Sequence, residues 1–104
     1  MSAASEIVRH ANIDGVVVKL AKTGGLLEAL KVIHTARAHA LQVMFGCMIE
    51  SSVGVTAAAH LQSLCDHLDL DGALLLANDP FTGVQYNEGL LTLPNLPGLG
   101  VERK

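Results

Sequence analysis

The sequence lacks tryptophan, and aromatic residues make up only 3% of it, so it offers few side chains on which nucleic-acid bases stack. It also lacks a basic run: seven Lys and Arg residues face ten Asp and Glu residues, and the formal net charge is −3 at pH 7. This balance argues against a nucleic-acid partner. No apolar stretch approaches the roughly 20 residues that span a bilayer, and residues 1–14 are too polar for a secretory signal. We therefore expect a cytoplasmic protein that contacts neither nucleic acid nor membrane.

Cysteine is scarce as well. Cys47 and Cys65 are the only two, and their separation fits no zinc-binding motif. In a cytoplasmic protein we expect both to be reduced thiols within the core, a disulfide between them being the alternative.

What the chain does have is a globular composition, with 104 residues of which half are hydrophobic, enough for one modest domain. Strand-like blocks alternate with helical blocks along it. The expected strands are residues 15–21, 41–50 and 68–76, and the expected helices are 2–11, 26–40 and a segment from Ser51 or Ser52 to Leu68. The Gly-, Pro- and Asn-rich residues 78–101 predict turns and a short hairpin. The β-α-β-α-β order with apolar strands predicts an α/β fold with a parallel sheet. A complete eight-stranded barrel takes about 250 residues, far more than this chain has.

The expected strands end in polar residues on their C-terminal side, where parallel α/β folds build their active sites. These polar residues are Lys19 and Lys22, then Glu50, then Asp69 and Asp71.

Lys19 interrupts an apolar run, which costs free energy unless the charge is paired or used. Strand alternation places Val17, Lys19 and Ala21 on one face and Val18 and Leu20 on the other. If the second set packs against helices, Lys19 points into a barrel lumen, with Lys22 nearer solvent. Spacing alone leaves open a lysine that snorkels to water or forms a buried ion pair.

The carboxylates are open to two interpretations too. Asp69 and Asp71, two apart, share one face of the expected strand and can converge on a cation, or they simply form a polar strand end. Glu50 precedes a predicted helix, whose N-terminus a carboxylate stabilises. The spacings of the helical histidines favour ordinary surface or half-buried positions over metal ligation; they are His34, His39, His60 and His67.

Three stretches together are similar to a known family. They are VVVKLAKTGGLLEALKV (16–32), VMFGCMIESSVGVTAAAHL (43–61) and DLDGALLLANDPFTG (69–83). They resemble the C-terminal barrel strands of the enolase superfamily, and most closely the dipeptide epimerases (the L-Ala-D/L-Glu epimerase group) of its muconate-lactonizing subgroup. The resemblance implies that residues 1–104 are the C-terminal portion of a (β/α)8 barrel, comprising strands six to eight and a short hairpin. The capping domain and the first barrel strands have no counterpart in these residues.

The resemblance also implies roles for the polar strand ends. Lys19 matches one of two acid/base catalysts that flank the substrate α-carbon, so it is the expected catalytic residue. Asp69 and Asp71 match a D-x-D pair that binds the free ammonium group of a dipeptide. Glu50 and Lys22 are expected to support the site.

The backbone from Cys47 to Ile49 is implied to border the substrate. The family uses Mg²⁺, but its metal ligands and its opposing lysine lie on earlier strands, so we expect no metal ligand in this chain. As a partner the chain therefore requires the N-terminal half of the barrel, and alone it is expected to be inactive. The alternative is a non-catalytic α/β module that self-associates through exposed sheet edges.

Overall fold

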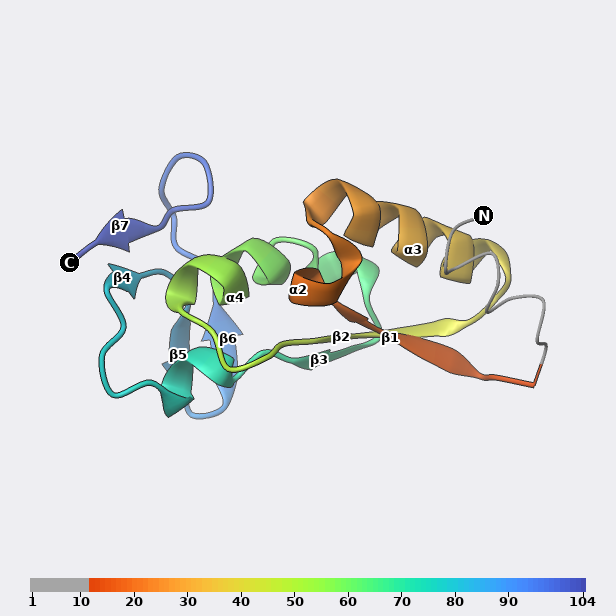
Figure 1. Ribbon diagram of the computed structural model, residues 1–104, viewed down its shortest axis with the longest axis horizontal. Coiled ribbons are helices and arrows are strands. Elements are labelled where there is room, and N and C mark those ends of the chain that lie inside the picture. The colour runs from red at the N-terminus through yellow and green to blue at the C-terminus, as the bar shows by residue number, and fades with distance from the viewer. Residues whose placement is uncertain (1–11) are drawn as a thin grey trace.

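The computed structural model describes residues 12–104, so the helix expected over residues 2–11 lies outside the described range. Three strands form one parallel sheet in the order β1-β2-β3. They are β1 (Gly15–Lys19), β2 (Gln42–Gly46) and β3 (His67–Asp69). Helix α3 (Leu26–Ala38) connects the first pair, and α4 (Ser52–Ala59) with the 3₁₀ helix η1 (Gln62–Leu64) connects the second. Both α-helices lie on the same side of the sheet (Figure 1). The prediction of an α/β fold with a parallel sheet is confirmed.

The core lies between this sheet and the helices α3 and α4. Val18 of β1 and Phe45 of β2 are fully buried against Ile33 of the helix. Valines and aromatic residues favour strands, and the buried positions of α3 follow the helical repeat. The other face of the sheet is open in the described part of the chain, where 59% of Val17 is exposed.

The strands are shorter than predicted. β1 ends at Lys19 because residues 20–23 form a helical turn, α2 (Leu20–Thr23), which removes Ala21 from the strand face assigned to it. β2 ends at Gly46 and β3 at Asp69, after which the 3₁₀ helix η2 (Gly72–Leu75) begins. The apolar residues that extended both predictions, such as Ile49 and Leu75, are exposed beyond the strands. An apolar run therefore predicted buried strand at positions that are exposed loop or 3₁₀ helix in the structure.

The second predicted helix is divided. α4 ends at Ala59, η1 follows, and Leu68 belongs to β3. The apolar spacing had continued because Leu61 and Leu64 lie three apart, which suits a 3₁₀ turn as well as an α-helix. Ser51 stands at the N-cap but makes no side-chain capping bond.

The predicted hairpin is confirmed. β5 (Gln85–Asn87) pairs antiparallel with β6 (Leu90–Thr92), and Glu88 and Gly89 between them have φ of 52° and 81°. Two such residues are what a two-residue hairpin turn requires. A second antiparallel pair, β4 (Phe81–Thr82) with β7 (Glu102–Arg103), was not predicted.

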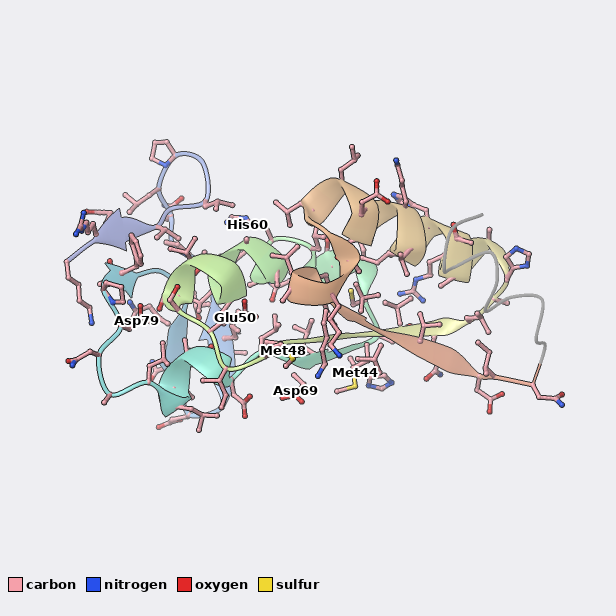
Figure 2. All side chains as sticks on the ribbon, in the orientation of Figure 1. Met44, Met48, Glu50, His60, Asp69 and Asp79 are labelled. Atoms are coloured by element: carbon pink, nitrogen blue, oxygen red, sulfur yellow. The ribbon has the colours of Figure 1, made fainter. Side chains whose placement is uncertain are left out.

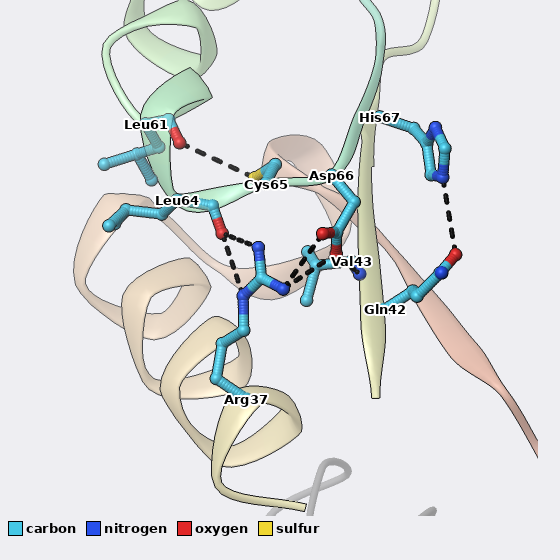
Figure 3. A network of polar contacts seen from close by, with 8 residues as sticks. All are labelled: Arg37, Gln42, Val43, Leu61, Leu64, Cys65, Asp66 and His67. Carbon is cyan, nitrogen blue, oxygen red and sulfur yellow. Dashed lines mark hydrogen bonds and ion pairs between the residues drawn. The ribbon is translucent and has the colours of Figure 1, made fainter. Parts of the chain in front are cut away.

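An ion pair ties α3 to the amino end of β3 (Figure 3). The Arg37 Nη1 donates to both carboxylate oxygens of Asp66, at 3.1 and 2.8 Å. Asp66 Oδ2 also accepts the Val43 amide at 2.8 Å, and its own amide donates to the Val43 carbonyl at 2.8 Å. The amide of Val43 and the guanidinium of Arg37 lower the pKa of Asp66. This network lies at the opposite end of the sheet from the polar strand ends. No helix within residues 12–104 is long and apolar enough to cross a bilayer.

Candidate active site

The carboxyl ends of the three strands bring polar residues into one row. Lys19 pairs in register with Gly46, and Gly46 with Asp69, so the last residues of β1, β2 and β3 lie side by side. Because side chains alternate along a strand, Lys19 lies on the open face of the sheet together with Val17. Asp69, which pairs with Gly46, lies on the same face of the sheet as Met44. Figure 2 shows Met44 and Asp69 on the side of the sheet away from α3.

A glycine at the centre of this row makes room for the lysine. A Cβ placed on Gly46 would lie 3.4 Å from the Lys19 Cε and 3.7 Å from its Cγ. The aliphatic stem of Lys19 therefore crosses directly over β2, which is a common reason for glycine inside a strand. Its Nζ lies 3.8 Å from the Sδ of Met48. The amine is thus directed toward the loop that follows β2.

A pocket of about 260 Å³ lies between that loop and the start of η2. It is lined by Lys19, Cys47, Met48, Ile49, Asp71, Gly72 and Leu75. The pocket brings together the lysine, one aspartate and both loop residues that the sequence singled out. A larger pocket, of about 490 Å³, has Asp69 and Asp71 in its wall beside leucines of the hairpin.

The sequence predicted that Asp69 and Asp71 share one strand face, but in the structure they do not. β3 ends at Asp69, and Asp71 stands at the N-cap of η2, with φ −102° and ψ 2°. The chain leaves the sheet between them because Leu70 turns into the core, where it is buried. Both aspartates are exposed, and they share a wall of the larger pocket.

The corner at Asp71 packs tightly against the end of β2. The Gly72 amide donates to the Cys47 Sγ at 3.2 Å, and that sulfur lies 4.0 Å from the Asp71 Oδ1. A Cβ on Gly72 would overlap the Met48 carbonyl oxygen, so only glycine fits here. Burial raises the pKa of the Cys47 thiol, and the carboxylates of Asp71, Asp69 and Glu50 raise it further, against the bond from Gly72. This thiol is held protonated, as a donor rather than a nucleophile. Cys47 and Cys65 are both free, and each is half-buried.

Glu50 and Lys22 stand apart from these pockets. The Glu50 carboxylate lies over the first turn of α4, where a Cβ on Gly54 would overlap its Oε2 (Figure 2). A carboxylate in this position complements the partial positive charge of a helix N-terminus. Lys22 is exposed in the last turn of α2.

Three contributions were not predicted from the sequence: the close approach at Gly46, the side-chain contact of Met48 with Lys19, and Tyr86, which lines the larger pocket. A glycine interior to an apolar strand signals a close approach, so Gly46 could have been found. Nothing local marks the other two, because their partners are distant in sequence.

Within residues 12–104, no three His, Cys, Asp or Glu side chains are arranged to hold a metal ion. Two histidines have ordinary partners: the His60 Nε2 lies 2.9 Å from the Leu99 carbonyl, and the His67 Nε2 lies 3.4 Å from the Gln42 side chain.

Comparison with known proteins finds relatives of this chain both in sequence and in structure. The family described as enolase C-terminal domain-like matches residues 1–104. An L-Ala-D/L-amino acid epimerase of Pedosphaera parvula is 50% identical over 93 residues, which cover 86% of this chain and 27% of that protein. The substrate-liganded L-Ala-D/L-Glu epimerase of Bacillus subtilis superposes with a TM-score of 0.87 at 35% identity, over 94% of this chain and 28% of that one. The dipeptide epimerase of Cytophaga hutchinsonii, complexed with Mg and D-Ala-L-Val, gives 0.89 at 30% identity, over 97% and 29%. The chain thus spans about a quarter of the length of these relatives.

Proposed function

Because the chain belongs to the enolase C-terminal domain-like family, we propose that it forms the C-terminal part of a dipeptide epimerase, with its parallel strands as barrel strands six to eight. The observation that carries this proposal is the row in which Lys19 and Asp69 end their strands on either side of Gly46. A base and an ammonium-binding carboxylate are both needed at the same edge of the barrel.

The proposed chemistry is a 1,1-proton transfer at the α-carbon of a dipeptide of the L-Ala-L/D-Glu type. One base removes the α-proton from one face, and an acid returns a proton to the other. The Lys19 amine is the group that takes or gives the proton on its face, acting as a base when neutral and as an acid when charged. Asp69 and Asp71 bind the ammonium group and thereby place the α-carbon of the next residue within reach of Lys19.

The loop after β2 completes this half of the pocket. Cys47 and Ile49 border the substrate, supported by their place in the wall of the 260 Å³ pocket. Glu50 supports the site indirectly, by stabilising the start of α4, and Lys22, which lies outside both pockets, supports it only through its positive charge.

The opposing base and the metal belong to the remainder of the barrel in this proposal. Mg²⁺ is bound in the related epimerases of Cytophaga hutchinsonii and Methylococcus capsulatus. When bound, it stabilises the negative charge that develops on the substrate carboxylate. The residues of this chain bind and orient the dipeptide and move one proton.

The test is α-proton exchange of L-Ala-L-Glu with Mg²⁺ in deuterated water, followed by NMR. The 104-residue chain alone is expected to show no exchange, and mixing it with the complementary N-terminal part of a related epimerase is expected to restore it. Lys19→Ala should abolish the conversion of L-Ala-L-Glu into L-Ala-D-Glu in the restored mixture, because that conversion needs a group on each face, whereas Lys22→Ala, a lysine outside both pockets, should retain most of it. Restored conversion that survives Lys19→Ala would contradict the proposal.

A second candidate is a non-catalytic module that associates with itself. It is favoured by the uncovered sheet face, where Val17 is largely exposed. A stable oligomer that neither recruits the complementary part nor gains exchange would select this alternative.

A further inference from the structure

Tyr86 is the only tyrosine of the chain, and it connects the hairpin to the acidic pair. It lies on β5, half-buried, and its hydroxyl donates a hydrogen bond to the carbonyl oxygen of Leu70. Leu70 is buried and stands between Asp69 and Asp71. The phenol ring also lines the 490 Å³ pocket that both aspartates share.

Both peptide groups that flank Asp71 are held by side chains from elsewhere in the fold. The Leu70 carbonyl belongs to the peptide that precedes Asp71, and it accepts the Tyr86 hydroxyl. The Gly72 amide belongs to the peptide that follows, and it donates to the Cys47 Sγ. Two fixed peptide planes leave little freedom in φ and ψ at Asp71, which adopts the sparsely populated bridge region.

The hydrogen bond donated by the Tyr86 hydroxyl is present at neutral pH. Burial raises the pKa of Tyr86 to about 12, and electrostatic interactions with Cys47, Asp71 and Asp79 contribute to the increase. The hydroxyl is therefore protonated at neutral pH and remains a donor.

We propose that Tyr86 is a positioning residue for Asp71: by holding the Leu70 carbonyl, it fixes the direction of the Asp71 carboxylate toward the ammonium group of the ligand. This inference rests on the proposed function for the identity of the ligand. It adds the C-terminal hairpin to the site as the element that sets ammonium affinity. Tyr86 itself touches no reacting atom.

The first experiment needs no activity. In ¹H–¹⁵N spectra of the 104-residue chain, Tyr86→Phe should shift the amide resonances of Asp71 and Gly72. The matched control is Thr82→Val, which removes another hydroxyl of the C-terminal tail, one that lies 3.4 Å from the Glu102 carbonyl. It should leave both resonances in place. If Tyr86→Phe leaves the Asp71 amide unmoved, the proposal is wrong.

The second experiment uses the reconstituted epimerase. Tyr86→Phe should raise the KM for L-Ala-L-Glu about tenfold, the scale of one lost hydrogen bond to a site-forming group, with kcat changed less than about twofold. The inhibition constant of N-propionyl-L-Glu, which lacks the ammonium group, should stay the same. Equal weakening of both ligands would mean that the hydroxyl only stabilises the fold and would overturn the proposal. If the unmodified assembly shows no exchange, the proposed function fails, and the amide resonances still decide whether Tyr86 positions Asp71.

Discussion

Close packing around Asp71 depends on its neighbour Gly72, which has no side chain. Gly72 lies directly against the backbone of Met48, with no room for a Cβ, and this contact seats the start of η2 on the end of β2. The obstacle is a carbonyl oxygen rather than the flexible end of a side chain. Any larger residue must therefore push the two segments apart.

Gly72→Ala should destabilise the chain by about 2–4 kcal/mol, because overpacking against backbone cannot be relieved by a rotamer change. Urea unfolding followed by circular dichroism measures this. Gly54→Ala is the matched control: its Cβ would meet only the movable carboxylate of Glu50, and alanine is favoured in a helix by about 1 kcal/mol, so stability should stay level or rise. Equal unfolding free energies for Gly72→Ala and the unmodified chain would contradict the prediction.

Single residues were predictable from the sequence where polarity alone identifies them. Lys19, Asp69 and Asp71 stand out because charge is rare in and beside apolar strands, and the structure places all three beside the described pockets. The side-chain contacts of Met48 and Tyr86 were not predictable, because they join positions 29 and 16 residues apart.

At the scale of the element, the N-terminus of α4 is capped by a carboxylate from the C-terminal part of the chain, that of Asp79. The Asp79 Oδ2 accepts the Ser52 amide at 2.9 Å and also the Ser52 hydroxyl, while its Oδ1 accepts the Phe81 amide at 3.1 Å. Ser51 occupies the N-cap position of this helix but makes no such bond itself. The cap could not be deduced from local sequence, since it is 27 residues away.

Asp79→Ala should lower the unfolding free energy at pH 7 by about 1 kcal/mol, as the loss of a helix cap does. Ser51→Ala, beside it, should change it by less than about 0.5 kcal/mol. Thermal unfolding at several pH values measures both. Burial acts to raise the pKa of Asp79, but the hydrogen bonds from Ser52 and Phe81 outweigh it and lower the pKa.

The direction of that pKa shift fixes the pH dependence. A carboxyl whose folded pKa is below its unfolded value stabilises the fold fully above the unfolded value, about 3.9, and loses this contribution as pH falls through the folded pKa. The difference between the unmodified chain and Asp79→Ala should therefore be constant from pH 5 to 8 and shrink below about pH 4. A difference that persists unchanged at pH 2 would show that the charge of Asp79 is not what caps α4.

The type of β1, α3 and β2 was predictable but their length was not, and most of the strand predicted over residues 68–76 is not a strand, since η2 follows β3. The centres of β1, α3 and β2 lie where the apolar patterns predicted them. Their ends depend on pairing: β3 has only three residues, which pair with residues 44–46, so the sheet stops where Gly46 and Asp69 lose their partners. The register between two distant segments cannot be deduced from the local sequence pattern of either segment.

At the scale of the whole molecule, the chain is extended rather than spherical. Its radius of gyration is 14.4 Å, against about 13 Å for a compact domain of this length, and its extents are 45 × 27 × 25 Å. Within residues 12–104, β1 and β3 each pair on one side only, with β2 (Figure 1). A sheet covered on one face and unpaired at both edges is what a section of a barrel would expose, and such surfaces attract other chains.

Charge introduced on the open sheet face should therefore reduce association of the chain with itself. Val17→Lys adds a cation where 59% of the residue is already exposed, so folding tolerates it. Sedimentation equilibrium should show the mass at high concentration falling toward the 10.9 kDa of the monomer. Leu27→Lys is the control: it is 66% exposed on α3, away from that face, and should leave the mass unchanged. The complementary barrel part should compete with self-association, because both require the same face. Equal reduction by both lysine variants would indicate that net charge, rather than the open face, controls assembly.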